Sequence, residues 1–396
     1  MQDVDVAIIG GGLAGSTAAA MLGRAGVPTV VIDPHRVYPP DLRCEKLDGT
    51  QADILRKTGI ADQVLPATTR DAGVRDGNVW IARLGHLIDK RPGDQYGILY
   101  DDLVNSVRAA IPPAVNVAVA KATSVITSAD RQLIDLSNGD TVSARLVVLA
   151  NGLNVALRHQ LGIERIVTST CHSITIAFDL KPRHATAFDF GALTYYPENA
   201  AAQMAYLTLF PIGATMRANL MVYRGMEDPW LRDIRRDPED SLFQLMPNLR
   251  RLTGDIEVTG QVKIRPADLY VTEGHRQPGI VLVGDAFATS CPAAGTGTGK
   301  VFTDVERLCN IHIPNWLASD GMDRAKISEF YDDPVKRAND DASTAKAYQL
   351  RSMSIDDGLA WHAQRWGRFF VRAGIGAARQ MRATMTARPL HTRPGA

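Results

Sequence analysis

The sequence is poor in cysteine and has no long apolar run. Its four cysteines form no C-x-x-C or other metal-like spacing, so we expect reduced thiols, no metal site and a cytoplasmic protein. No apolar run approaches the length of a membrane-spanning helix, and the first residues lack the basic leader of a signal peptide. The net charge of +1 argues against a dedicated nucleic-acid binder. These absences favour a soluble globular chain, and 396 residues allow two or three domains of about 150 residues each.

Acidic residues are missing from the C-terminal part of the chain. After Asp357 there is no aspartate or glutamate, and the segment interleaves Trp361, Trp366, Phe369 and Phe370 with arginines at positions 365, 368, 372, 379, 382, 388 and 393. We expect a helix that packs its aromatic side on the body of the protein and exposes its arginines to solvent. The alternative is contact between this basic, aromatic segment and an anionic membrane surface or an acidic partner.

The chain opens with the pattern of a parallel βαβ unit. An apolar strand is predicted at Val4–Ile9, a helix of small residues at about 13–25, and a second apolar strand at Thr29–Ile32. The strands flank the sequence Gly-Gly-Gly-Leu-Ala-Gly, which begins at Gly10, and Asp33 ends the second strand. Strand, glycine turn, helix, strand and terminal acid in this order predict a dinucleotide-binding unit.

Each glycine of this motif has a separate physical role. Gly10 permits a tight turn, Gly12 lets a pyrophosphate approach the backbone, and Gly15 lets the helix pack closely on the strand. The free N–H groups and the dipole of the helix N-terminus favour phosphate charge. The carboxylate of Asp33 is placed to accept hydrogen bonds from ribose hydroxyls.

The remaining chain predicts a second domain inserted into the first. Short strands and a hairpin turn at Asn138-Gly139 suggest a β-meander before the apolar strand that ends at Asn151-Gly152. Longer strands with one helical cover follow, before an apolar strand returns and ends at Gly284-Asp285. We expect an α/β protein with a Rossmann-like domain at 1–166 and 273–330, an inserted antiparallel-sheet domain at 167–272 and a helical C-terminal segment at 331–396.

The segment from Gly284 to Val301 superficially suggests a nucleotide-triphosphate loop, because it ends in Gly299-Lys300. The P-loop pattern requires a glycine where Ala294 stands and a metal-binding hydroxyl where Val301 stands. Both requirements fail, so this segment is interpreted as a strand-to-helix turn with another ligand. Lys300 is then expected to be a helix residue.

These motifs, taken in order, resemble flavin-dependent aromatic hydroxylases of the p-hydroxybenzoate hydroxylase type. The resemblance spans most of residues 4–330, and its most specific element is G-D-x(6)-P-x-x-G-x-G combined with Asp304 and Leu308. It implies FAD, with Asp285 accepting from ribitol or ribose hydroxyls and the backbone at 295–298 favouring negative charge at the flavin N1/O2 edge. Arg43 is a candidate for the flavin phosphate or ring edge. The expected cofactor-binding residues are Gly10, Gly12, Leu13, Ala14, Gly15, Asp33, Arg43, Asp285, Pro292, Gly295, Thr296, Gly297 and Thr298.

Two departures from the family pattern affect the expected electron donor. The family motif D-G-x-x-S-x-h-R, where h is apolar, aligns with residues 151–158, where Asn151 replaces the aspartate and Val155 the serine. Tyr100 stands where many relatives carry an arginine that meets the flavin. We therefore expect NADH or NADPH as donor, used either directly or through a partner flavin reductase.

The resemblance implies that a flavin C4a-hydroperoxide transfers one oxygen atom from O₂ to an aromatic or polyketide-like substrate, so the protein needs few acid or base groups. His172 is a candidate base for a phenolic proton, and the candidate substrate contacts are Tyr195, Tyr196, Phe210, Met216 and Arg265. Three alternatives stay open: a flavin-dependent halogenase, although the chain has no W-x-W, a flavin reductase for isoprenoid double bonds, and a non-catalytic binder like the GDP-dissociation inhibitors.

Overall fold

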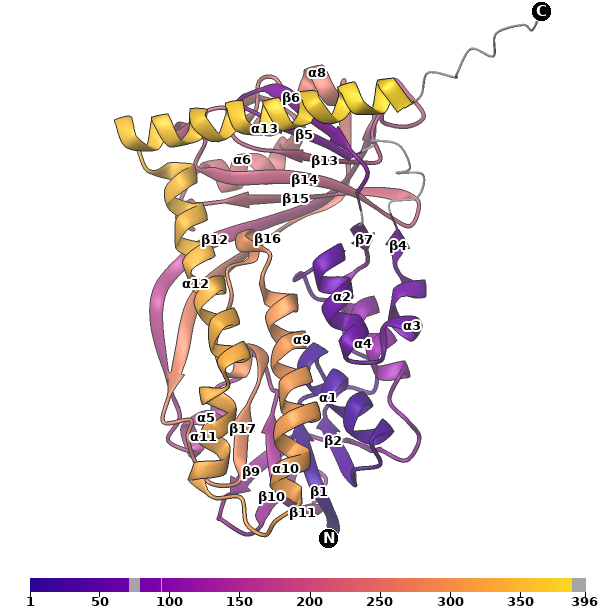
Figure 1. The fold of residues 1–396 in the computed structure, drawn as a ribbon, viewed down its shortest axis with the longest axis vertical. Coiled ribbons are helices and arrows are strands. Elements are labelled where there is room, and N and C mark those ends of the chain that lie inside the picture. The colour runs from indigo at the N-terminus through magenta and orange to yellow at the C-terminus, as the bar shows by residue number, and fades with distance from the viewer. Residues whose placement is uncertain (71–78, 94, 387–396) are drawn as a thin grey trace, which may run out of the picture. The chain divides into compact units, whose positions relative to one another are not determined.

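The computed structural model describes residues 1–70, 79–93 and 95–386, and it divides into two units (Figure 1). Unit 1 consists of Met1–Thr69, Gln95–Ser173 and Arg265–Tyr348. Unit 2 consists of Arg70–Asp94, Ile174–Ile264 and Gln349–Ala396. The chain therefore leaves unit 1 and returns to it twice. The division differs from the expected boundaries in several places. Residues 70–94 and the chain after 348 group with unit 2, while 167–173, 265–272 and 331–348 group with unit 1.

Unit 1 is built on a seven-stranded sheet centred on strand β1 (Gln2–Ile9). β1 pairs in parallel with β2 (Thr29–Asp33) on one side and with β11 (Thr141–Leu149) on the other. The remaining strands are β8 (Asn116–Val119), which is parallel to β2, β17 (Ile280–Leu282), which is parallel to β11, and the antiparallel β9 (Ala122–Ile126) and β10 (Gln132–Leu136). The expected meander is thus only partly formed, because its first strand, β8, joins the parallel edge instead.

Both faces of this sheet are buried, as expected for parallel strands covered by crossover helices. Val6 and Ile8 on one face of β1 belong to an apolar cluster with residues of helix α1 (Leu13–Arg24) and helix α9 (Gly297–Arg307). Ala7 and Ile9 point to the other face and pack with residues of β9, β10 and β17. The glycine turn directly follows the last residue of β1, so it lies at the edge where the parallel strands end.

Shorter elements complete unit 1. A small sheet contains β3 (Lys46–Asp48) and β7 (Gln95–Gly97), together with β4 (Thr69–Arg70), which lies at the boundary of the units. The other helices are α2 (Gly49–Lys57), α3 (Ala61–Val64), α4 (Tyr100–Ala109), α5 (Ala156–Gln160), α10 (Ile313–Leu317), α11 (Arg324–Asp332) and α12 (Pro334–Ile355), whose last residues belong to unit 2.

Unit 2 contains the expected long-stranded sheet, in the order β16-β12-β15-β14-β13-β5-β6. Neighbouring strands are mostly antiparallel, but β5 and β13 pair in parallel. The bounds are β5 (Val79–Arg83), β6 (His86–Arg91), β12 (Glu164–Pro182), β13 (Ala192–Tyr195), β14 (Met204–Ile212), β15 (Thr215–Val222) and β16 (Ile256–Glu273), with helices α6 (Trp230–Arg236), α7 (Pro238–Leu245), α8 (Arg250–Thr253) and α13 (Leu359–Thr386). The hairpin β5–β6 joins this sheet, a placement that the sequence did not indicate.

The C-terminal helix α13 forms as expected and packs against β6. Its arginines at 368, 372 and 382 are exposed as expected, but two of its aromatic side chains and Arg365 depart from the prediction. Arg365 turns inward and donates to the carbonyl oxygens of Met353 and Asp356, while Trp366 and Phe370 are 47% and 65% exposed. Arg365 thus caps carbonyl groups at the end of α12, and the Trp366 and Phe370 side chains stay on the surface. Residues 388 and 393 lie outside the described part of the chain. No helix that the structure describes is both long and apolar enough to cross a membrane.

Candidate flavin site

The glycine turn after β1 fits the role that the sequence gives it. Gly10 has φ +105°, and a Cβ atom there would lie 2.5 Å from the carbonyl oxygen of Ala150. A Cβ atom on Gly15 would lie 1.8 Å from the carbonyl oxygen of Gly10. Gly12 is the N-cap of α1 and has no side chain to cap it, and a Cβ atom there would meet nothing nearer than 3.9 Å. The first-turn N–H groups of α1 therefore face open space in which an anion can bind.

Asp33 is fixed in place at the end of β2 by two backbone hydrogen bonds and one ion pair. Its Oδ2 accepts from the Gly11 N–H at 2.7 Å, and its Oδ1 accepts from the His35 N–H at 2.8 Å. The guanidinium of Arg108 lies 3.1 Å from Oδ1 and also donates to the carbonyl oxygen of Gly11. A carboxylate has about four lone-pair sites, so these contacts leave capacity for a further donor such as a ribose hydroxyl. Sequence reasoning missed Arg108, because an arginine in the last turn of α4 carries no local signal of this contact.

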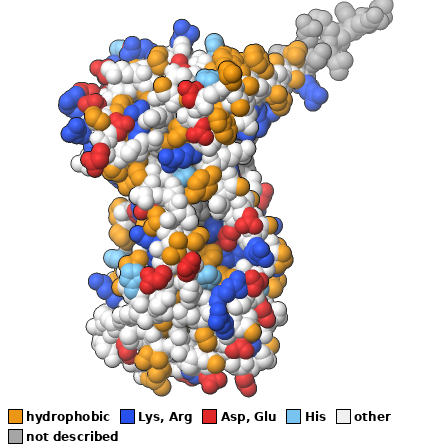
Figure 2. Space-filling view, turned by 90° about the vertical axis from the view of Figure 1, so that its left-hand side faces the viewer, with side chains coloured by type: hydrophobic (Ala, Val, Ile, Leu, Met, Phe, Trp, Pro, Cys, Tyr) orange, Lys and Arg blue, Asp and Glu red, His pale blue; other side chains and the backbone are white. Residues whose placement is uncertain are grey.

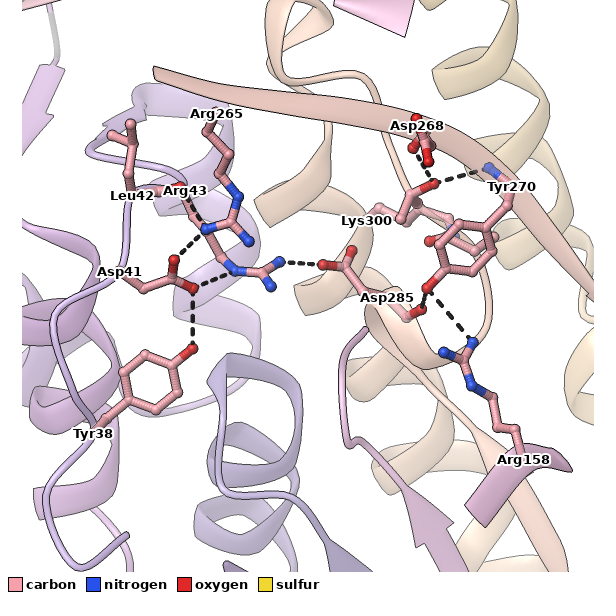
Figure 3. Close-up of polar contacts among 12 residues, drawn as sticks. Tyr38, Asp41, Leu42, Arg43, Arg158, Arg265, Asp268, Tyr270, Asp285 and Lys300 are labelled. Carbon is pink, nitrogen blue, oxygen red and sulfur yellow. Dashed lines mark hydrogen bonds and ion pairs between the residues drawn. The ribbon is translucent and has the colours of Figure 1, made fainter. Parts of the chain in front are cut away.

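The second half of the site follows β17 at the same edge of the sheet. Gly284, with φ +62°, opens a short 3₁₀ turn that places Asp285 beside Arg43, and the two form an ion pair (Figure 3). The hydroxyl of Tyr270 donates to the backbone oxygen of Asp285. Arg158, which is 1% exposed, donates to the backbone oxygen of Ala286 at 2.9 Å. The backbone of this turn is therefore held from β16 and α5, while the Asp285 side chain faces Arg43.

Arg43 belongs to a network of alternating charges (Figure 3). Its Nε lies 2.7 Å from Asp41, which also pairs with Arg265. Burial opposes the charge of Arg43, but Asp285 and Asp41 nevertheless raise its pKa above the usual value. Burial likewise opposes the charge of Asp41, yet Arg43 and Arg265 hold its pKa below the usual value. Arg43 and Asp41 are therefore charged at neutral pH, and the network offers both donors and acceptors to polar cofactor atoms.

The small-residue loop leads into α9 as the sequence predicts. Gly295 has φ +63°, a Cβ atom there would meet no heavy atom within 4 Å, and its carbonyl oxygen accepts from Gln51 Nε2 at 2.9 Å. Helix α9 begins at Gly297, and its N-cap, Thr296, makes no side-chain cap but bonds Ser343 at 2.6 Å. The N–H groups at 297–299 are thus available to a ligand. Gln51 was not predicted, since its partner lies 244 residues away.

Helices α1 and α9 pack against each other, so two uncapped helix starts lie at one edge of the sheet. The Cβ atom of Ala14 lies 3.3 Å from the position that a Cβ atom on Gly284 would take. Leu13 and Ala14 are buried beneath the first turn, and Pro292 opens the short 3₁₀ turn before Gly295. Two adjacent groups of free N–H donors, separated by a carboxylate, suit a ligand with phosphates at one end and an anionic ring at the other. The residues present therefore fit FAD.

Lys300 lies inside α9, as expected, and its side chain is buried in a charge network. Its ammonium lies 3.2 Å from Asp340, and Lys336 lies 3.3 Å from Asp304 and 2.8 Å from Asp340. Burial raises the pKa of Asp304 even though Lys336 and Lys300 oppose the shift. The network joins α9 to α12 and so fixes the helix whose start forms the site.

The structure gives the other candidate residues different surroundings. His172 is fully buried in unit 1, with Nδ1 3.0 Å from Ser169 Oγ and its ring against Tyr348. Arg265 lies in unit 1 in the Arg43 network, and it donates to the Leu42 carbonyl oxygen at 2.9 Å. His172 lies in β12 and Arg265 in β16, in the parts of these long strands that group with unit 1. Their roles as base and substrate contact stay predictions.

The remaining substrate candidates lie in unit 2 and do not share one set of contacts. The Tyr195 hydroxyl donates to Glu198 at 2.5 Å, and Phe210 is fully buried with Val79. Tyr196 lies under the guanidinium of Arg83, while Met216 is a partly buried residue of β15. The contacts of Tyr195 and Phe210 are those of a folded core. Their assignment to substrate binding stays a prediction.

Comparisons with known proteins agree with this geometry. A family model described as FAD binding domain matches residues 3–311. Squalene epoxidase erg1 of Schizosaccharomyces pombe is 25% identical over 332 residues, which cover 79% of this chain and 70% of that protein. The 3-demethoxyubiquinol 3-hydroxylase of Escherichia coli is 25% identical over 338 residues, which cover 78% of this chain and 80% of that protein.

Similarity to solved structures extends over almost the whole chain and shows the fold alone. The p-nitrophenol 4-monooxygenase PnpA from Pseudomonas putida DLL-E4 superposes with a TM-score of 0.72 at 16% identity, covering 96% of this chain and 98% of that one. Flavin-dependent halogenases also share this fold. Because the family model spans most of the sequence, the chain belongs to the FAD binding domain family and is an FAD-dependent enzyme of the hydroxylase and monooxygenase kind.

Proposed function

We propose that the chain inserts one oxygen atom from O₂ into an aromatic or polyketide-like small molecule. In the balanced reaction, the substrate C–H, O₂, a nicotinamide hydride and a proton give the hydroxylated product, water and oxidised nicotinamide. The observation that carries the proposal is the pair of uncapped helix starts beside Asp285 in a family of FAD-binding enzymes. Relatives named aklavinone 12-hydroxylase and 3-amino-4-hydroxybenzoate 2-monooxygenase support the substrate class.

Bound flavin would supply the activation of O₂, and the chain would supply orientation and electrostatics. The turn at Gly12 would bind the pyrophosphate, and Asp33 would accept from the ribose. The Asp285 carboxylate, which pairs with Arg43, would accept hydrogen bonds from ribityl hydroxyls. The N–H groups at 297–299 would stabilise negative charge at the near edge of the ring, which favours the reduced state.

The electron donor is proposed as NADH or NADPH, delivered directly or through a partner flavin reductase. The family motif D-G-x-x-S-x-h-R is implicated in contacts with both FAD and the nicotinamide. In this chain Asn151 replaces its aspartate and Val155 replaces its serine. Its arginine, Arg158, is buried against Ala286 and Tyr270 and is therefore committed to holding the flavin turn. This arrangement favours a reductase partner over direct binding of a nicotinamide at this motif.

The test uses the purified FAD-loaded protein with a panel of phenols and hydroxylated anthraquinones. We expect one panel member to give a product that carries a single ¹⁸O atom from ¹⁸O₂, with NADH, NADPH or an added flavin reductase as electron source. Asp285→Asn should reduce FAD retention and turnover at least about tenfold, whereas Asp102→Asn, an exposed change on α4, should not.

Other outcomes would replace the proposal by one of its rivals. A halogenated product in the presence of chloride or bromide would identify a halogenase. Saturation of an isoprenoid double bond without oxygen incorporation would identify a reductase, an activity named among the relatives. A colourless protein that retains no FAD would favour a non-catalytic binder.

A further inference from the structure

A cluster of arginines in unit 2 surrounds a hollow that is separate from the flavin site. The hollow, of about 170 Å³, lies between the hairpin β5–β6 and helix α13. Its polar lining consists of Asp89, Tyr196 and four arginines, Arg83, Arg91, Arg372 and Arg379. Among the described residues, Asp89 is the only carboxylate in this lining, and it already pairs with Arg379.

The charge of this hollow is not balanced by the described residues. In the part of the chain that the structure describes, no carboxylate forms an ion pair with Arg83, Arg368 or Arg372. Arg83 stacks on the Tyr196 ring at 3.5 Å from its centroid, and its Nε is buried without a hydrogen-bond partner. Burial lowers the pKa of Arg83, and repulsion from Arg372 and Arg368 lowers it further, while Tyr196 acts in the opposite direction. An anion in the hollow would offset this repulsion.

A second, larger hollow adjoins the first, and its lining combines arginines with the apolar side chains of Val371 and Ile375. It measures about 710 Å³ and shares Arg83, Arg372 and Ile375 with the first hollow. Val371 and Ile375 of α13 line it, although they are 62% and 45% exposed. Apolar side chains gather on the surface of unit 2 toward the end of α13 (Figure 2). Large apolar side chains on a surface beside arginines are the pairing that an anionic amphiphile requires.

Helix α13 is held close to the hairpin, so both hollows are built features of unit 2. A Cβ atom on Gly376 would lie 2.1 Å from the carbonyl oxygen of Ile88, which shows how closely α13 approaches β6. Arg379 fixes the same turn of the helix through its ion pair with Asp89. Arg372 lies one heptad before Arg379, on the same side of the helix, and is directed toward the hairpin.

We propose that this double hollow binds an anionic amphiphile, whose phosphate or carboxylate group meets Arg83 and Arg372 and whose apolar part lies along Val371 and Ile375. A fatty carboxylate and a phospholipid headgroup share this chemistry. The site belongs to unit 2 and does not depend on the function proposed for the flavin site.

The experiment titrates octyl phosphate below its micellar concentration into the FAD-loaded protein and measures binding by calorimetry. We expect saturable binding that Arg83→Gln and Arg372→Gln each weaken at least about tenfold. The matched control, Arg235→Gln, removes the same charge from an exposed position on α6 and should bind as the parent protein does. Inorganic phosphate, which lacks the tail, should bind more weakly and show the same sensitivity to both hollow variants.

Vesicles distinguish the source of the amphiphile. In one outcome, the parent protein cosediments with phosphatidylglycerol vesicles but not with phosphatidylcholine vesicles, and Arg83→Gln abolishes this cosedimentation. That result would support the proposal with a bilayer lipid as ligand. Octyl phosphate binding without cosedimentation would support it with a free amphiphile.

Without ligand, the melting temperature of Arg372→Gln should equal or exceed that of the parent, because repulsion among the arginines is relieved. No saturable octyl phosphate binding, or equal binding by folded Arg372→Gln, would overturn the proposal.

Discussion

Gly12 and Gly15 lie three residues apart in one motif, yet the structure gives them different constraints. Gly15 has no room for a side chain, since a methyl group there would overlap the carbonyl oxygen of Gly10. Gly12 has room, and its backbone has φ −75°, which any residue can adopt. The fold therefore places no steric demand for glycine at position 12, whereas it constrains position 15 directly.

The two alanine variants should separate these roles. Gly15→Ala should lower the free energy of unfolding of the FAD-free protein by ~1–3 kcal/mol or more, because overlap at this distance forces the strand and helix apart. Gly12→Ala should cost about 1 kcal/mol or less, the usual effect of alanine at an N-cap, but should weaken FAD binding strongly. Urea unfolding of the FAD-free protein and flavin fluorescence titration measure the two effects. Equal FAD affinity in Gly12→Ala and the parent would refute the assignment of the phosphate to this turn.

Helix α13 provides a comparable contrast at the scale of an element. A Cβ atom on Gly376 would overlap the carbonyl oxygen of Ile88 in β6. A Cβ atom on Gly374 would meet no heavy atom within 4 Å. Alanine favours a helix over glycine by about 1 kcal/mol wherever it fits. Gly374→Ala should therefore stabilise α13, and Gly376→Ala should loosen its contact with β6.

Hydrogen exchange of α13 and β6 measures this difference directly. We expect faster exchange in both elements for Gly376→Ala and equal or slower exchange for Gly374→Ala, relative to the parent. Protection of β6 that is unchanged in Gly376→Ala would show that the helix is not held by this contact.

The elements themselves were largely predictable, while many of their contacts were not. Periodicity and glycine placement predicted β1, α1, β2 and the start of α9, because these features depend on neighbouring residues. The pairing of Arg43 with Asp285 joins residues 242 positions apart, and Arg108 reaches Asp33 from another helix. Such contacts depend on tertiary packing, and no local pattern encodes them. The inward turn of Arg365 was mispredicted for the same reason, because its acceptors are the ends of other elements.

At the scale of the whole molecule, the two proposed ligands should act on different units. FAD should slow hydrogen exchange at 10–15 and 284–298 in unit 1, and octyl phosphate should slow exchange in β5, β6 and α13 in unit 2. Protection should reach about 100-fold for segments that must open to release the ligand, at ligand concentrations of about 100 times Kd. Mass spectrometry of peptides localises each effect. Protection of 284–298 by octyl phosphate would place that ligand in the flavin site and contradict a second site.

The central place of β1 has a consequence for the growing chain on the ribosome. This strand precedes its partners in the chain: β11 ends only at Leu149, and the pairing of β11 with β17 requires residues up to Leu282. Until β11 has left the exit tunnel, the backbone N–H and C=O groups on one edge of β1 have no partner and can pair with a neighbouring nascent chain. The sheet that carries the glycine turn is therefore completed only after residues up to Leu282 have been synthesised.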